Sequence, residues 1–175
     1  HYQTIIRTAF AHRGSVLLVA PTAAVVRELH QALKQGISDR ITCFHGEQGK
    51  RSRAVAYEQL LDLSRARLII TTPSFAYLDR PDFSTIVIEA VGSSNYVERT
   101  RPYLDHRQAL ITLARITKRQ LILSDTLART EDEYHRREDR YLTYGEHQRR
   151  LNLPATLTIV EQHDKPKGDV PFSLF

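Results

Sequence analysis

The side chains best placed for chemistry lie in turns that directly follow short apolar runs. One is a carboxylate, Glu89, at the end of the run Ile86–Ile88, and a carboxylate can ligate Mg²⁺ or orient a water molecule. The others carry a hydroxyl or an imidazole group: Thr22, His45, Thr72, Ser74, Ser124 and Thr126. Hydroxyls and backbone N–H groups in such turns can contact phosphate oxygens without reading bases. Nearby Lys50, Arg51 and Arg53 would supply positive charge.

Several of these residues also have a purely structural interpretation. Glu89 is then a carboxylate that merely ends a strand, and His45 is a turn residue or a helix cap. Cys43 lies within an apolar run, and we expect it to pack in the core. Tyr96 can stack on a base, and an interdomain packing role is the alternative.

Stronger signatures of catalysis are missing from the 175 residues. The sequence has no Gly-rich phosphate loop of the Walker type, no nucleophile elbow and no spacing typical of metal ligands. Its single cysteine excludes an internal disulfide and a thiolate zinc site, and favours a reducing, cytoplasmic location. No apolar run approaches the ~20 residues that span a bilayer, so we expect no membrane partner.

The elements that must position these side chains are predicted by apolar runs. Six runs are short and rich in β-branched residues, and they lack strict polar alternation: 16–19, 41–44, 68–70, 86–88, 121–123 and 157–160. That pattern is typical of parallel strands covered on both faces.

Helical periodicity separates the strands. Apolar stripes with a period near 3.6 cover residues 25–33, 54–61 and 103–114. Gly36 lies where a C-terminal cap belongs, and Pro102 lies where a first helical turn is expected. Alternating strands and helices predict an α/β fold with a three-layer, doubly wound, mainly parallel sheet.

The charge balance favours a polyanionic partner without requiring one. The formal net charge is +5, which suits contact with DNA but also fits an ordinary solvated surface. Residues 129–150 are dense in charges of both signs. We interpret them as a solvated helix followed by a loop, with a dedicated DNA contact as the alternative.

The order of the motifs resembles the first motor lobe of superfamily 2 DNA helicases of the primosomal protein N-prime (PriA) type. The segment 14–22 is similar to the family's strand and Pro-Thr turn, and Phe44-His45-Gly46 to its His-Ser-Gly turn. The stretch 68–78 runs on to a second strand, 83–88, at the family's separation from its Walker B acid. Ser93–Tyr96 and Arg101–Tyr103 resemble the motifs that follow that acid.

The resemblance continues to the end of the chain. Leu121–Leu127 resembles the strand and Ser-Ala-Thr-Pro turn of helicase motif III, and Leu153-Pro154 precedes the last predicted strand as in the family. It implies a RecA-like lobe of the P-loop NTPase class over residues 1–162, with 163–175 as a linker toward a second lobe. It also implies that His1 and Tyr2 lie on the helix just after the phosphate loop. Because the chain has no methionine, we expect it to begin inside a longer protein.

Two departures from the family bear on ATP hydrolysis. Its Asp-Glu-Glu-His reads Glu89-Ala90-Val91-Gly92 here. This degenerate Walker B keeps a possible Mg²⁺ ligand at Glu89 but has Ala90 at the position of the catalytic glutamate. Loss of a general base commonly costs ~10²–10⁴-fold in rate. Asp125 also places a negative charge in the motif III turn.

The sequence and the resemblance together predict a lobe of the replication-restart (primosome) type, defective in ATP hydrolysis and retained for binding DNA or a partner. DNA would be bound without sequence preference, and replication or repair proteins are further candidate partners. ATP and Mg²⁺ are the family's cofactors, but we expect neither to bind this chain alone. The alternatives are an active ATP-dependent helicase in the complete protein, a non-enzymatic protein-interaction module, and a nucleotide- or small-molecule-binding α/β domain.

Overall fold

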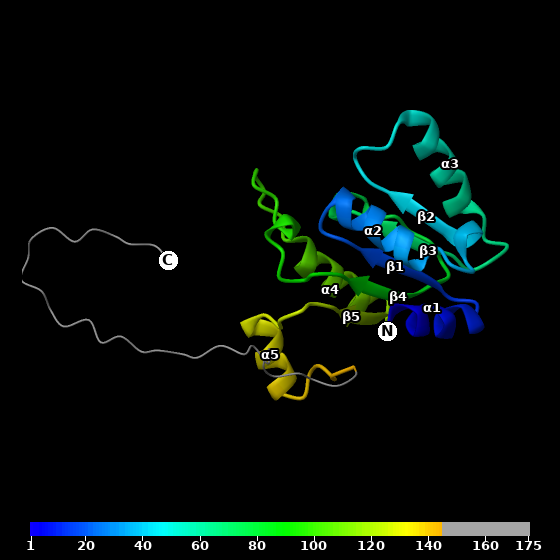
Figure 1. The fold of residues 1–175 in the computed structure, drawn as a ribbon. Coiled ribbons are helices and arrows are strands. Elements are labelled where there is room, and N and C mark those ends of the chain that lie inside the picture. The colour runs from blue at the N-terminus through cyan, green and yellow to red at the C-terminus, as the bar shows by residue number, and fades with distance from the viewer. Residues whose placement is uncertain (145–175) are drawn as a thin grey trace, which may run out of the picture.

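Helices and strands alternate along residues 1–144, which are the residues that the computed structural model describes (Figure 1). The strands are β1 (Ser15–Val19), β2 (Ile41–Phe44), β3 (Leu68–Thr71), β4 (Phe83–Ile88) and β5 (Gln120–Leu123). The α-helices are α1 (Tyr2–Ala11), α2 (Ala23–Leu33), α3 (Lys50–Leu61), α4 (His106–Ile116) and α5 (Thr130–Arg137). Short 3₁₀ helices cover Ser38–Arg40, Pro73–Phe75 and Ser94–Tyr96.

All five apolar runs before residue 145 form strands, as the sequence predicts. The run at 157–160 and the linker at 163–175 lie outside the described residues.

The strands form one parallel sheet in the order β2-β3-β1-β4-β5. In the central part of the register, Leu17 of β1 lies opposite Ile69 of β3 and Ile86 of β4. Every residue of β1 is buried. This confirms the prediction of parallel strands covered on both faces, because a strand with no solvent-facing side has no need of polar alternation.

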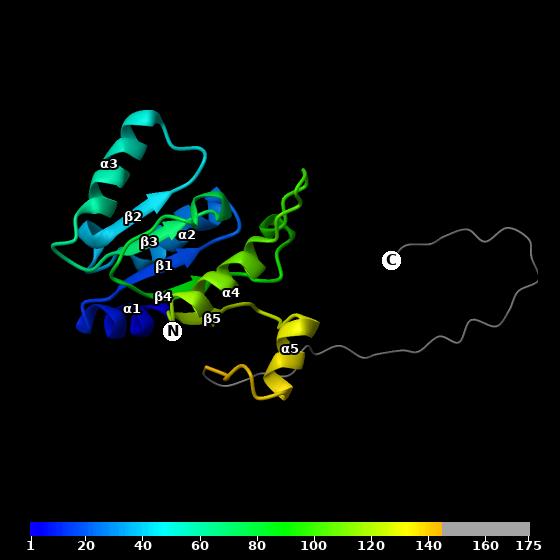
Figure 2. The same ribbon diagram turned by 180° about the vertical axis from the view of Figure 1, so that it is seen from behind.

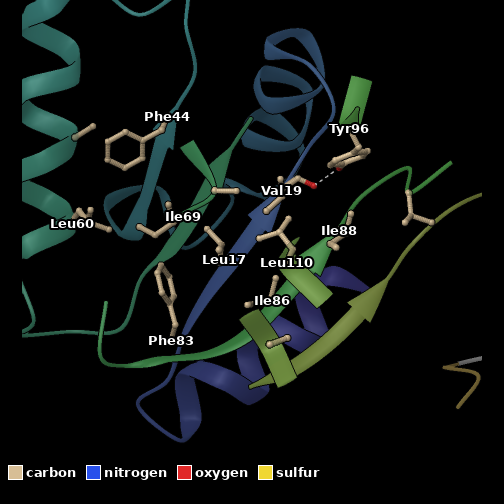
Figure 3. Packing of buried hydrophobic residues seen from close by; sticks show 14 residues of the cluster. Leu17, Val19, Phe44, Leu60, Ile69, Phe83, Ile86, Ile88, Tyr96 and Leu110 are labelled. Carbon is tan, nitrogen blue, oxygen red and sulfur yellow. Dashed lines mark hydrogen bonds between the residues drawn. The ribbon is translucent and has the colours of Figure 1, made fainter. Parts of the chain in front are cut away.

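Alternate residues of the strands belong to two separate cores, one on each face of the sheet. Leu17 and Val19 pack on the face covered by Leu60 of α3 and Leu110 of α4 (Figure 3). Their neighbours in the chain, such as Leu18, point to the other face, which α1 and α2 cover. The two views in Figures 1 and 2 show the same helix–sheet–helix layers from opposite sides.

The connections make the sheet doubly wound. α2 carries the chain away from β1 on one face, whereas α4 carries it from β4 to β5 on the opposite face. The chain therefore departs in opposite directions from β1 and β4, and the carboxyl ends of two such neighbouring strands are where open parallel sheets commonly bind ligands. This three-layer, doubly wound arrangement confirms the predicted fold class and is consistent with a RecA-like lobe.

The prediction that a helix begins at Pro102 is wrong. α4 begins at His106, and Asp105 caps it by accepting a backbone hydrogen bond in the first turn. Pro102 lies in a hairpin closed by an isolated antiparallel bridge between Val97 and Asp105. A proline ring suits either position because its fixed φ fits both turns and first helical turns. The C-terminal cap expected at Gly36 lies elsewhere: α2 ends at Leu33 with Lys34 as its right-handed cap, and Gly36, whose φ is 80°, lies in the turn that follows.

A buried arginine holds the opposite edge of the sheet together, at the amino ends of the strands. Arg80 is 1% exposed, and its guanidinium donates to Asp82 and to the backbone carbonyls of Leu60 and Asp62. Ser15 at the start of β1 also donates to Asp82. These partners satisfy the buried charge, and through them Arg80 connects the start of β1 to the end of α3.

The helices are short, and the last is dominated by its own ion pairs. In α5, Arg129 pairs with Asp132, and Glu133 pairs with Arg136 and Arg137. The solvated helix expected within residues 129–150 is therefore present, while residues 145–150 lie outside the described part. No helix in residues 1–144 has the length and apolar character needed to cross a membrane.

Candidate functional site

The candidate residues predicted from the sequence lie along one edge of the sheet. Because all five strands are parallel, the turns that follow them share the carboxyl edge. In spatial order, His45 follows β2, Thr72 and Ser74 follow β3, Thr22 follows β1, Glu89 follows β4, and Ser124 and Thr126 follow β5. With neighbouring strands about 4.8 Å apart, this edge extends over roughly 19 Å.

Positive charge gathers at the β2 end of this edge. α3 begins there, just after the turn that leaves β2, and Lys50 and Arg51 in its first turn are exposed. Arg53 is held differently: its guanidinium donates to the Gln48 carbonyl at 3.1 Å and lies over the Phe75 ring. Lys50 and Arg51 are therefore free to meet a phosphate, while Arg53 mainly fixes the turn.

His45 is a turn residue, and a glutamine side chain holds its backbone. The Gln48 carboxamide donates to the Cys43 carbonyl at 2.8 Å and accepts from the His45 N–H at 3.2 Å. It thereby occupies backbone groups at the end of an edge strand, where a further strand would otherwise pair. Burial, followed by the charges of Arg27 and Arg53, lowers the pKa of His45. Its imidazole is therefore neutral at pH 7 and offers a phosphate a hydrogen bond rather than a charge.

Cys43 behaves as a packing residue, as expected. Its side chain is partly buried beside the second core, and burial raises the pKa of the thiol to about 11. The group therefore stays protonated at neutral pH and is a poor nucleophile.

The candidate hydroxyls along this edge differ in their availability. Thr22 is the N-cap of α2, and its Oγ1 accepts from the Val25 N–H at 3.3 Å. The hydroxyl proton of Thr22 is still available to an acceptor outside the helix. Ser74 and Thr126 are exposed, and Thr72 is half-buried.

At the other end of the edge, Glu89 is partly buried and lies near a second carboxylate, that of Asp125. Burial raises the pKa of the Glu89 carboxyl, the Asp125 charge adds to this, and the Ser124 hydroxyl acts in the opposite direction. Glu89 Oε2 is shielded from solvent and has no hydrogen-bond partner within residues 1–144. Ser124 is itself fixed from α1, because the Tyr2 hydroxyl donates to its Oγ at 2.5 Å.

The turns after β4 and β5 are tied to each other. The Asp125 carboxylate accepts from the backbone N–H of Gly92 at 2.6 Å and from that of Thr126 at 2.7 Å. The Val91 N–H donates to the Ser124 carbonyl at 3.0 Å. A Cβ added to Gly92 would lie 2.9 Å from Asp125 Oδ2, so a larger residue here would displace the Asp125 carboxylate from its present position.

Ala90 occupies a strained position between these contacts. Its φ is 48°, in the left-handed region that side-chain-bearing residues seldom adopt. Its methyl group can neither take up a proton nor orient a water molecule. The residue after Glu89 therefore contributes backbone shape and no acid–base group to the edge.

The Tyr96 side chain packs at the carboxyl ends of β1 and β4. This side chain is fully buried, and its hydroxyl lies 2.6 Å from the Glu89 carbonyl and 2.9 Å from the Val19 carbonyl (Figure 3). A fully buried ring has no face for a base to stack on. The ring packs within this domain. Neither base stacking nor interdomain packing, the two roles considered from the sequence, therefore describes Tyr96.

The residues present fit a resident Mg²⁺ poorly. Within residues 1–144 no three His, Cys, Asp or Glu side chains come close enough to hold a metal ion. Both oxygens of Asp125 already accept backbone hydrogen bonds, which leaves Glu89 as a single free carboxylate. Magnesium bound by one carboxylate depends on substrate phosphates for its other ligands, and this sequence has no loop to hold them.

Sequence reasoning missed several residues that shape this edge, namely Tyr2, Gln48 and Gly92. Their partners are set by strand order and by turn geometry. Gly92 carries the one visible signal, because a glycine in the turn that follows a strand, here four residues after the end of β4, often marks a close backbone approach.

Comparison with known proteins does not place the chain in a family. Neither a scan against protein-family models nor a search of curated protein sequences finds a match.

Proposed function

We propose that this chain is a PriA-like helicase motor lobe that binds the DNA backbone without turning over ATP. The observation that carries the proposal is the common edge: the turns after all five strands lie side by side, candidate hydroxyls follow β3, β1 and β5, and Lys50 and Arg51 are exposed at one end. Such an edge can follow several consecutive phosphates of a single strand. Contacts of this kind position a nucleic acid without reading its sequence.

The distribution of charge favours one end of the edge for DNA. Lys50 and Arg51 lie at the β2 end, whereas Glu89 and Asp125 lie at the β4–β5 end. A phosphate chain is attracted to the first group and repelled by the second. We therefore expect the single-stranded DNA to contact Lys50, Arg51, Thr72 and Ser74. The DNA should leave the protein surface before it reaches Glu89.

Two features argue against ATP turnover. Ala90 carries no acid–base group, and the only free carboxylate beside it is Glu89, whose raised pKa weakens it as a metal ligand. We expect no ATP hydrolysis above background, with or without single-stranded DNA, for the wild-type chain and for Ala90→Glu. DNA-stimulated hydrolysis by the wild type would contradict this part of the proposal.

DNA binding is tested by titrating labelled single-stranded DNA with the 175-residue chain at several salt concentrations. Binding should weaken steeply with salt, since each neutralised phosphate contributes about 0.7 to the logarithmic slope for a single strand. Lys50→Ala/Arg51→Ala should reduce that slope by about 1.4.

The matched control is Arg7→Ala/Lys34→Ala, which removes the same charge from exposed positions on α1 and at the end of α2. It should leave the slope near that of the wild type. Equal losses in both double variants, or no binding at low salt, would show that the edge is not a DNA site.

A protein-interaction module is the second candidate, and the surface of α3 favours it. Val55 and Leu61 on this helix and Leu63 just after it are 47%, 75% and 55% exposed. Large apolar side chains that stay exposed are available to pack against a partner protein. A stable protein complex lost in Leu61→Asp/Leu63→Asp, together with no DNA binding, would favour this candidate over the first.

A further inference from the structure

A hollow in the surface lies away from the carboxyl edge, between α4, β5 and the residues in and just after α5. Its volume is about 310 Å³, and its walls include Leu121 at the start of β5, His135 of α5 and Tyr141. Figure 2 shows α5 beneath α4 and β5, on the side away from α2 and α3. The hollow is therefore separate from the turns that carry the proposed DNA contacts.

Its lining is strongly basic. Among residues 1–144, three arginines contribute to the wall, Arg115 from α4, Arg119 just before β5 and Arg140 after α5, whereas no Asp or Glu does. Arginine side chains from three separate segments thus border one small space, and the Arg119 guanidinium also donates to Asp79 and to the Arg80 carbonyl. Arginine forks recognise phosphate and carboxylate groups through paired N–H donors.

The guanidinium groups of Arg115 and Arg140 are not paired with any carboxylate in residues 1–144, because the nearby acids have other partners. The α5 carboxylates Asp132 and Glu133 are paired with arginines of the same helix and its cap. Arg119 contacts Asp79 at 3.3 Å. Within residues 1–144, Arg115 and Arg140 pair with no carboxylate, and both are exposed.

The floor of the hollow offers further polar and apolar contacts. His135 Nδ1 is shielded from solvent and has no hydrogen-bond partner within the described residues. The His135 and Tyr141 rings lie 5.2 Å apart, beside the apolar Leu121. A small ligand with an anionic head and a partly apolar body would satisfy both kinds of surface.

We infer that this hollow binds a phosphate monoester, with Arg115 and Arg140 holding the phosphate group and Arg119 supporting it. A phosphate monoester fits better than a carboxylate because it offers three acceptor oxygens and about two negative charges to a wall that holds three arginines, two of them without a carboxylate partner in residues 1–144. This site does not depend on the proposed DNA function. Inorganic phosphate and a nucleoside monophosphate share the head group and differ in the body that would reach His135 and Tyr141.

The test is isothermal titration of the 175-residue chain with inorganic phosphate, with AMP and with adenosine, at constant ionic strength. Phosphate and AMP should bind, and adenosine should not. Tighter binding of AMP than of phosphate would assign a nucleotide-like ligand, whereas equal binding would assign free phosphate. Binding of adenosine as strong as that of AMP, or no binding of either anion, would overturn the inference.

Variants separate a specific site from diffuse attraction. Arg115→Ala/Arg140→Ala should weaken phosphate binding by about tenfold or more for each arginine. Arg115→Lys/Arg140→Lys keeps the charge and should recover only part of the affinity, since lysine lacks the fork. Arg7→Ala/Lys34→Ala removes equal charge elsewhere and should have no effect.

Both substituted arginines are exposed, so we expect the variants to stay folded, and circular dichroism checks this. An equal loss of binding in Arg7→Ala/Lys34→Ala would mean that net charge alone attracts the anion, and the site would be rejected. Unchanged binding in Arg115→Ala/Arg140→Ala would reject it as well.

Discussion

The carboxylate of Asp125 accepts a hydrogen bond from the backbone N–H of Gly92, with 2.6 Å between oxygen and nitrogen. This contact joins the turn after β5 to the turn after β4. It also brings a second negative charge toward Glu89, and that charge contributes to the raised pKa of the Glu89 carboxyl. One aspartate thus shapes both the backbone and the electrostatics of this end of the edge.

Removing the Asp125 side chain should affect stability and titration together. Asp125→Ala deletes two hydrogen bonds to backbone N–H groups and should lower the free energy of unfolding by about 1 kcal/mol. It should also lower the pKa of Glu89, followed by NMR of the carboxyl carbon. Glu28→Ala, an exposed acid on α2, is the control and should change neither quantity. A Glu89 pKa that stays fixed in Asp125→Ala would show that the Asp125 charge does not contribute to it.

The Glu89 charge should make stability depend on pH in a defined direction. Its pKa is raised in the folded state, so folding favours the protonated form. The wild type then loses stability as pH rises from the unfolded pKa of about 4.3 through the raised folded pKa. Glu89→Gln should therefore be more stable than the wild type at pH 7 and nearly equal to it below pH 4. Urea unfolding across this range measures the difference, and a destabilised Glu89→Gln at pH 7 would contradict the assignment.

Tyr96→Phe tests the hydroxyl that spans β1 and β4. The substitution keeps the buried ring but leaves the Glu89 carbonyl without the donor 2.6 Å away. We expect a loss of about 1–2 kcal/mol in the free energy of unfolding, measured by urea titration. Tyr103→Phe, at an exposed ring, should cost little. An unchanged free energy of unfolding in Tyr96→Phe would mean that packing of the ring, and not its hydroxyl, stabilises this part of the fold.

A glycine should stabilise the end of α4. Lys118 follows the cap of this helix with φ of 53°, a left-handed conformation that suits glycine. Lys118→Gly should raise the free energy of unfolding by about 0.5–1 kcal/mol, because relief of strain exceeds the entropy added to the unfolded chain. Lys34→Gly, at the right-handed cap of α2, should be destabilising by a similar amount. Thermal unfolding compares the two, and a loss in Lys118→Gly would show that this residue is not strained.

Local sequence patterns were sufficient to predict the strands and most helices. A run such as Leu68–Ile70 is apolar at every position because both faces of its strand are covered, and this property is visible without knowing any neighbour. The same pattern predicts a parallel sheet, and a parallel sheet places every following turn on one edge. Pro102 shows the limit of such signals, because the bridge between Val97 and Asp105 decides its conformation.

Of the candidate edge, the sequence identifies which residue types follow each strand, including Glu89 with Ala90 after it. It does not determine the strand order, because the pairing of β1 with β3 and β4 depends on contacts between residues about 50 to 70 positions apart. That order alone makes Ser124 a neighbour of Glu89, brings Tyr2 to Ser124 and gives Tyr96 a carbonyl of β1 to bond. The basic hollow likewise exists only because the fold brings Arg115, Arg119 and Arg140 together. The sequence determines which chemical groups follow each strand, whereas long-range packing decides which of these groups come together in a site.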